Sequence, residues 1–321
     1  MLTDQEFVRA VATAVLAPSL HNSQPWSFHR HDDRIVVRAD PARWLRQEDP
    51  LGRELMLSCG GAVRHLVLDL RAQGLDVSWE LAPDADDAFL IAHVDVTGRR
   101  PATLLDVELH VATRLRHSDR SRFSSDPVMA HIVDRLRGIA ELEGCFLADL
   151  DDDRQLSLAV VTDHADRVLR TNPGMQAEAA RWTSATPFPS EGVPAADVGT
   201  PEARRGSPVT LRQFGDPTPV VDDQEPPVPE RPTVLVLGTD SDARADWIAC
   251  GWTLSDLLLT LTCEGLVASP MTQSLELPAD RVRLQTALGL TGYPQMVLRV
   301  GYPAGTGSPH TGRREVTDVL A

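Results

Sequence analysis

The stretch APSLHNSQPWSF, residues 17–28, is the segment around which the rest of this chain can be interpreted. Pro18 has no backbone N–H and clashes with a preceding helical turn, so it ends the helix before it. Polar side chains follow at Ser19, Asn22, Ser23 and Gln24. Pro25 stiffens the exit, and Trp26 adds one large apolar anchor. A rigid polar loop of this kind suits a flat ligand with polar edges, and an ordinary helix-to-strand connection is the alternative.

The same stretch resembles the Ala-Pro-Ser-x-x-Asn-x-Gln-Pro-Trp signature of the nitroreductase-like flavoproteins, which bind FMN, and every signature position is filled. The resemblance implies that Ser19, Asn22 and Gln24 approach the flavin. It also implies that Pro18 and Leu20 supply apolar contact. His21 is a candidate donor to the flavin, with an exposed loop histidine as the alternative.

Composition excludes several classes of function. The net charge of −15 argues against a general nucleic-acid binder or a binder of anionic membranes, because phosphates attract basic surfaces. All 31 basic residues are arginine, which excludes a P-loop lysine and a Schiff-base lysine. The four cysteines form no C-x-x-C pair and lie in apolar segments, so we expect reduced core residues in a cytoplasmic protein. We also expect no signal peptide and no membrane-spanning segment.

Hydrophobic periodicity and capping signals divide the chain into helices and strands. Thr3 and Glu6 form a capping box at the start of a helix that leads into the stretch 17–28. A strand is expected at 34–38, and two long apolar helices are expected at 49–74 and 242–265. Residues 186–232 are rich in proline and too long for a plain connection, so they predict either a lid or a loosely ordered excursion.

The two long helices match each other. Cys59-Gly60 in the first corresponds to Cys250-Gly251 in the second, and both helices run on to Gly-Leu, at residue 74 and at residue 265. The numbers differ by 191 at both ends (250 − 59 and 265 − 74). Leu-rich helices align easily by chance, but the coincident ends favour a duplication and hence a dimer fused into one polypeptide.

A fused chain resembles a narrower group, the Acg-type proteins of actinobacteria, in which one FMN lies between two halves and is covered by a lid. The resemblance implies an α+β, nitroreductase-like fold: an internally duplicated pseudo-dimer with antiparallel-rich sheets packed around long central helices. The expected halves are residues 1–110 and 111–321, with the lid at about 183–232. We expect a monomer with pseudo-two-fold symmetry.

Two basic elements are candidates for binding the FMN phosphate. Arg116-His117-Ser118-Asp119-Arg120 resembles the Arg-x-Ser-x-Arg/Lys element of the family. The resemblance implies that Arg116 and Ser118 bind phosphate and that Arg120 reaches the ribityl or pyrimidine region. A solvated helix end is the alternative. Arg313 and Arg314 match a second basic pair that closes on the phosphate in this family.

A loop after the second long helix is the candidate for the flavin ring. Its residues Pro270, Met271, Thr272 and Gln273 resemble the family's loop in which a backbone N–H faces flavin N5, and a simple turn is the alternative. Only one half carries each signature, which predicts one FMN per chain.

Two functions remain open at this point. The first is an oxidoreductase in which NAD(P)H reduces FMN and a small aromatic acceptor, a nitroaromatic or a quinone, is then reduced. It requires no catalytic acid or base of the protein. The second is a flavin-sequestering protein whose lid prevents turnover. A metal site at His29 and His31 is disfavoured, because there is no H-E-x-x-H motif.

Overall fold

The structure is a computed structural model that describes residues 1–184, 190–194, 230–305 and 311–321. The chain divides into two compact units. Unit 1 comprises Met1–Arg116, Asp242–Cys263 and Gly312–Ala321, and unit 2 comprises His117–Ser241 and Glu264–Thr311. The Pro-rich lid expected at about 183–232 lies mostly outside the described residues and stays a prediction, as does the division at residue 110.

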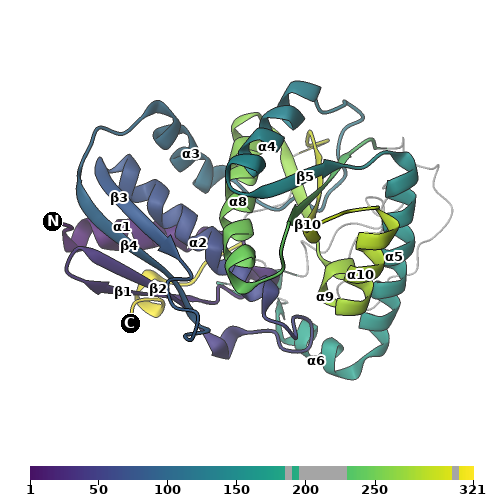
Figure 1. The fold of residues 1–321 in the computed structure, drawn as a ribbon, viewed down its shortest axis with the longest axis horizontal. Coiled ribbons are helices and arrows are strands. Elements are labelled where there is room, and N and C mark those ends of the chain that lie inside the picture. The colour runs from purple at the N-terminus through teal and green to yellow at the C-terminus, as the bar shows by residue number, and fades with distance from the viewer. Residues whose placement is uncertain (185–189, 195–229, 306–310) are drawn as a thin grey trace. The chain divides into compact units, whose positions relative to one another are not determined.

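Unit 1 contains a four-stranded antiparallel sheet with the order β1-β2-β4-β3 (Figure 1). Its strands are β1 (Trp26–His31), β2 (Arg34–Ala39), β3 (Leu75–Leu81) and β4 (Leu90–Arg99). The sequence analysis placed Trp26 and Phe28 in a loop, and this was wrong, because both belong to β1. The strand escaped notice because its outward positions carry Ser, His and Arg, while Trp26 and Phe28 alternate inward.

The helices of unit 1 cover this sheet and one another. They are α1 (Asp4–Ala14), η1 (Leu20–Asn22), η2 (Pro41–Arg43), α2 (Arg53–Ala72), α3 (Leu104–Leu115), α8 (Arg244–Cys263) and η4 (Val316–Asp318). Helix α2 was expected to begin at Asp49. It begins at Arg53, because Gly52 takes a left-handed φ of 75° and the Asp49 carboxylate accepts the Leu55 N–H at 2.9 Å. The expected burial of α2 is confirmed, since every residue from Arg53 to Leu70 is buried.

Unit 2 contains a second four-stranded antiparallel sheet, with the order β5-β8-β10-β9. Its strands are β5 (Cys145–Asp149), β8 (Thr233–Thr239), β9 (Val267–Met271) and β10 (Tyr293–Gly301), and a separate parallel pair is formed by β6 (Thr183–Ser184) and β7 (Val193–Pro194). The helices are α4 (Ala130–Leu142), α5 (Asp152–Thr171), α6 (Pro173–Arg181), α9 (Gln273–Glu276) and α10 (Pro278–Ala287).

The two sheets have the same topology, which confirms the predicted duplication. In the first sheet the chain runs β1, β2, helix α2, β3, β4, and the strand that comes last in sequence lies third in the sheet. In the second it runs β5, β8, helix α8, β9, β10, and again the last strand lies third. Each long helix therefore connects the second and third strands of an identically ordered sheet.

Helices α2 and α8 cross at a pair of glycines within unit 1. A Cβ on Gly60 would lie 2.1 Å from the carbonyl oxygen of Ile248, and a Cβ on Gly251 would lie 2.0 Å from that of Leu57. Ile248 and Leu57 are related by the same offset of 191 positions as the two glycines. Each helix therefore contacts the other through equivalent residues, which is the mark of a two-fold relation.

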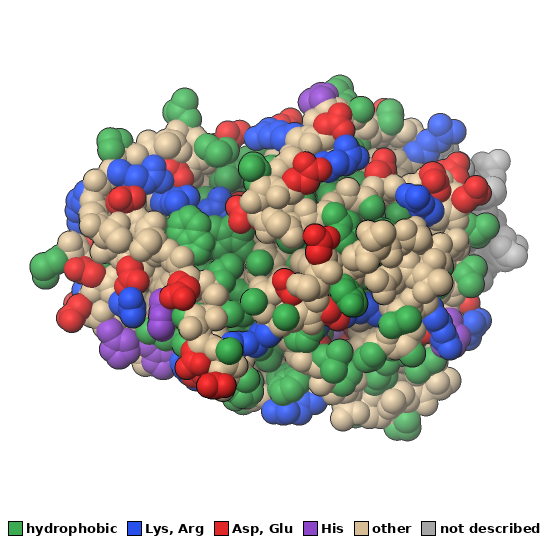
Figure 2. All heavy atoms as spheres, viewed as in Figure 1, with side chains coloured by type: hydrophobic (Ala, Val, Ile, Leu, Met, Phe, Trp, Pro, Cys, Tyr) green, Lys and Arg blue, Asp and Glu red, His purple; other side chains and the backbone are tan. Residues whose placement is uncertain are grey.

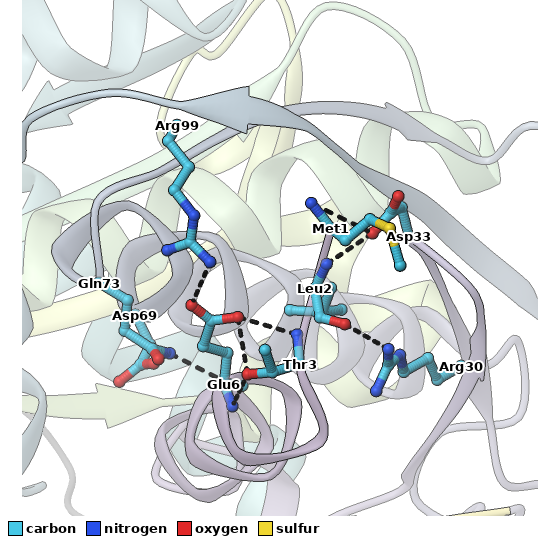
Figure 3. A network of polar contacts seen from close by, with 9 residues as sticks. All are labelled: Met1, Leu2, Thr3, Glu6, Arg30, Asp33, Asp69, Gln73 and Arg99. Carbon is cyan, nitrogen blue, oxygen red and sulfur yellow. Dashed lines mark hydrogen bonds and ion pairs between the residues drawn. The ribbon is translucent and has the colours of Figure 1, made fainter.

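The N-terminal segment is held by polar contacts that Figure 3 shows. The capping box is confirmed, with the Thr3 N–H 2.8 Å from a Glu6 carboxylate oxygen and the Glu6 N–H 3.3 Å from the Thr3 hydroxyl. Arg99 donates to the other Glu6 oxygen at 2.8 Å, and Gln73 donates to the Glu6 carbonyl at 3.1 Å. These contacts join α1 to β4 and to the residue that follows α2, which fixes the helix that leads into residues 17–28.

Each unit also contains a buried ion pair. In unit 1 Arg64 Nε donates to Asp256 at 2.7 Å, and the same guanidinium lies over the ring of Trp252. In unit 2 Arg299 donates to Glu230 at 2.7 Å, and both side chains are inaccessible to solvent. On the face shown in Figure 2, by contrast, acidic and basic side chains are interspersed across the surface.

Candidate functional site

The loop that follows α1 has an unusual backbone. His21, Asn22 and Gln24 take positive φ values of 49°, 54° and 49°. Residues other than glycine seldom adopt this region, and such strain persists at sites that bind or react because the surroundings enforce it. Here the Ser19 hydroxyl accepts the Gln24 N–H at 2.9 Å and closes the loop on itself. Residues 21–26 are all buried, so the loop is part of the interior rather than a surface connection.

A buried hydrogen bond holds His21 in place. Its Nε2 lies 2.7 Å from Glu48 Oε2, and both side chains are almost completely buried. The alternative that His21 is an exposed loop histidine is therefore wrong. Its role as a donor to a flavin stays a prediction. Glu48 was not predicted, because nothing in its local sequence links it to the loop.

The loop is bonded to the C-terminal segment of the chain. Gln24 Oε1 accepts the Arg314 N–H at 2.8 Å, and the Asn22 amide donates to the Gly312 carbonyl at 3.1 Å. The Arg313 guanidinium donates to the Leu16 carbonyl at 3.3 Å. The structure therefore brings together two groups of predicted site residues that are about 290 positions apart in sequence.

Arg116 is the clearest sign of a ligand in unit 1. Its side chain is 6% exposed, and its Nε and Nη1 have no hydrogen-bond partner among the residues that the structure describes. Burial, together with the positive charge of Arg313, lowers the pKa of Arg116 to about 9. Burial also lowers the pKa of Arg313 to about 10. A buried cation with unsatisfied donors is costly, and an anion with several oxygens would satisfy it.

In unit 2 the structure brings the other predicted residues together. Ser118 pairs with Ala268 in a parallel bridge, and the Asp119 N–H donates to the Ala268 carbonyl at 3.0 Å. This places Ser118 and Arg120 at the strand that leads into Pro270, Met271, Thr272 and Gln273. The Gln273 side chain is buried, and its Nε2 has no partner within the described part of the chain.

The predicted site residues thus fall into two sets, one in each unit. Unit 1 contains Pro18, Ser19, Leu20, His21, Asn22, Gln24, Arg116, Arg313 and Arg314, and unit 2 contains Ser118, Arg120, Pro270, Met271, Thr272 and Gln273. Within each unit, the contacts given above join some of these residues to one another.

No group of three or more His, Cys, Asp or Glu side chains in the described ranges could hold a metal ion. The four cysteines are free; Cys59, Cys145 and Cys250 are buried, whereas Cys263, also expected in the core, is only half-buried. Among the helices that the structure describes, none has the length and apolar character needed to cross a membrane.

Comparison with known proteins places the chain among relatives of similar length. It is 33% identical over 326 residues to the Mycobacterium tuberculosis protein named "Putative NAD(P)H nitroreductase Rv3131", covering 99% of this chain and 92% of that one. It is 31% identical to the M. tuberculosis protein named "Putative NAD(P)H nitroreductase acg", covering 100% of this chain and 96% of that one. No family model matches the sequence.

Solved structures give a weaker similarity. A nitroreductase with bound FMN from Bacteroides fragilis covers 64% of this chain and 94% of its own, with 10% identity and a TM-score of 0.40. The assignment therefore rests on the sequence relatives, which match this chain over nearly its full length and over more than 90% of their own. The chain belongs to the nitroreductase-like family of Rv3131 and acg, the Acg-type group.

Proposed function

We propose that this protein binds FMN and uses it in NAD(P)H-dependent reduction. The observation that carries the proposal is the buried Arg116 guanidinium, which is under the positive charge of Arg313 and whose Nε and Nη1 have no hydrogen-bond partner among the described residues. The FMN phosphate has the charge and the oxygens that such a group requires, and guanidinium–phosphate hydrogen bonds are among the strongest in proteins.

Other predicted residues, within each unit, have the chemistry to bind the rest of the cofactor. The loop with residues Ser19, Asn22 and Gln24 offers hydroxyl and amide groups on a backbone that its own contacts hold rigid. The buried Gln273 amide provides a further unsatisfied donor. We assign the remaining predicted residues, including Ser118, Arg120 and Arg314, to the same cofactor on the resemblance to the family.

When bound, FMN would supply the hydride-transfer chemistry that links a nicotinamide reductant to an acceptor. The protein's own residues bind and orient it. Arg116 and Arg313 hold the anionic end, and the strained loop keeps polar groups in fixed positions. The names of the relatives support NAD(P)H as the reductant, and we propose a nitroaromatic or a quinone as the acceptor.

Arg116→Ala tests the cofactor assignment, with Arg114→Ala as the matched control. Arg114 lies two residues earlier, near the end of α3, and its side chain is exposed. We expect Arg116→Ala to weaken FMN binding by roughly 100-fold or more, because several charge-assisted hydrogen bonds are lost. Arg114→Ala should keep FMN binding unchanged. Equal flavin content in both purified variants would contradict the phosphate assignment.

A flavin-sequestering role without turnover is the second candidate, favoured by the proline-rich composition of residues 186–232. Anaerobic addition of NADH and NADPH to the FMN-loaded protein separates the two candidates. Bleaching of the flavin absorbance within seconds supports the oxidoreductase. Bleaching only after deletion of residues within this segment supports sequestration.

A further inference from the structure

His65, in the middle of α2, is a buried group that the sequence analysis did not single out. Its side chain has no exposed surface, its Nδ1 lies 3.4 Å from the Thr13 carbonyl oxygen, and its Nε2 has no partner among the described residues. Burial and the charge of Arg116 lower the pKa of this imidazole to about 3. In the protein without a ligand, His65 is therefore neutral, with its hydrogen on Nδ1 and a lone pair on Nε2.

Helix α3 packs against α2, and Arg116 follows directly after α3. His110 of α3 lies 2.8 Å from Asp69 of α2, and further along, Ala112 shares a hydrophobic cluster with Leu68. Arg116 is the C-cap residue that follows α3, and its charge acts on His65, which lies one turn before Asp69 on α2.

Arg313 and His65 both contact the segment at the end of α1. His65 faces the carbonyl of Thr13, and Arg313 donates to the carbonyl of Leu16, three residues later. The positive charges of Arg116, Arg64 and Arg313 all act on the His65 imidazole. The carboxylates on the elements packed here are already bonded: Asp256 to Arg64, and Asp69 to Thr13 and His110. The charges that act on the His65 imidazole are therefore those of cations.

We propose that His65 is a further ligand of the FMN phosphate, contacting one phosphoryl oxygen through Nε2 by a hydrogen bond whose proton is taken up on binding. The inference rests on the proposed FMN binding and adds a residue to it. The Nε2 lone pair is under the charge of three cations, so a further cation would not be stabilised there. An anion that shares a proton with Nε2 would form hydrogen bonds with both Nε2 and the Arg116 guanidinium.

The uptake of a proton on binding follows from the number of hydrogen-bond donors at the contact between Nε2 and the phosphate. Above a pH of about 6 the phosphate of free FMN is mainly a dianion, which accepts hydrogen bonds and donates none. The neutral imidazole presents only a lone pair at Nε2, because its hydrogen faces Thr13. Two acceptors do not bond, so one proton from solvent must enter the space between Nε2 and the phosphoryl oxygen. FMN affinity should then fall as the pH rises.

The test is a fluorescence titration of FMN and of riboflavin, which lacks the phosphate, at pH 6.5, 7.5 and 8.5. For the unaltered protein we expect the Kd of FMN to rise by up to about tenfold per pH unit, with the Kd of riboflavin constant. His65→Gln should bind FMN with little pH dependence, since its amide donates without taking up a proton. His65→Leu should weaken FMN binding by about 10- to 100-fold at pH 6.5 and leave riboflavin binding unchanged.

An FMN affinity of the unaltered protein that is constant across this pH range would overturn the inference, and so would full FMN affinity in His65→Leu. The pH series needs no substitution, so it decides the matter even where a variant does not fold. Failure of the proposed function looks different, because the unaltered protein would then bind neither flavin, or both equally well, at every pH.

Discussion

Gly60 of α2 and Gly251 of α8 each lie against a carbonyl of the opposite helix, and these carbonyls belong to residues related by the same offset as the glycines themselves. This reciprocity gives a geometric account of the Cys-Gly coincidence in the sequence. The two helices approach so closely that only a hydrogen fits at either crossing position. The repeated glycine is therefore a requirement of the helix contact in both copies.

Gly251→Ala should destabilise the protein. The added methyl would lie 2.0 Å from the Leu57 carbonyl oxygen, and because this obstacle is backbone, the helices must separate. We expect the free energy of unfolding to fall by about 3 kcal/mol, measured by urea denaturation followed by circular dichroism. Gly138→Ala in α4 is the control, since no atom lies within 4 Å of the position of its Cβ. It should stabilise the protein by ~0.5–1 kcal/mol through helix propensity, and equal effects of the two changes would contradict the crossing.

One FMN per chain is the second prediction. By the offset between the helices, His65 corresponds to Asp256, which is buried and bonded to Arg64 at 2.7 Å. A carboxylate at this position repels a phosphate, and its ion pair occupies the arginine, so the equivalent place beside α8 is unsuited to a second cofactor. Acid extraction and absorbance at 445 nm should give a flavin-to-protein ratio near one, and a ratio near two would contradict this account.

The stability of the flavin-free protein should depend on pH through His65. Its pKa is about 3 in the folded chain, compared with about 6.5 when unfolded, so between these values only the unfolded chain binds the proton. The free energy of unfolding should therefore fall as the pH falls through this window, by about 1.4 kcal/mol per pH unit, and the effect should vanish above pH 6.5. Between pH 7 and pH 5 the unaltered protein should lose ~2 kcal/mol more than His65→Gln. Parallel losses in the two proteins would show that His65 is protonated when folded.

The buried ion pair of unit 2 should be necessary for stability. Glu230→Ala leaves the Arg299 guanidinium buried and without its carboxylate, and also removes the acceptor of the Phe123 N–H at 2.9 Å. We expect a loss of about 3–5 kcal/mol in urea denaturation. Glu264→Ala is the control, because its pair with Arg135 is solvent-accessible and should contribute about 1 kcal/mol or less. A loss as small as that of the control would mean that Arg299 finds another partner.

Much of the fold could be predicted from the sequence because its signals are local or repeated. The capping box of Thr3 and Glu6 and the apolar runs of α2 and α8 each follow from neighbouring residues. The strand Trp26–His31 was missed because its polar outward positions hide the alternation. The start of α2 was placed too early, because Pro50 is compatible with a first helical turn, whereas the left-handed φ of Gly52 is a property of the folded backbone.

Candidate site residues could be predicted only where they belong to a sequence motif. Asn22, Gln24 and Arg116 could be picked from the signature, and the structure connects the first two to the C-terminal segment. Glu48 and His65 could not, because their relevance arises from contacts over long sequence separations. The Arg64-His65 pair within the apolar middle of α2 was the available signal for His65, but periodicity assigns such positions to solvent. Here burial of α2 on all sides reverses that assignment.

Because the two long helices belong to a single polypeptide, their equivalent positions are encoded separately. In an assembly of two identical subunits, any replacement appears in both copies at once, so a carboxylate that closed one site would close the other. Gene fusion removes that constraint. Asp256 could therefore arise at the position equivalent to a retained His65. The two positions could then differ in role: His65 binds a ligand, and Asp256 forms an ion pair that stabilises the fold.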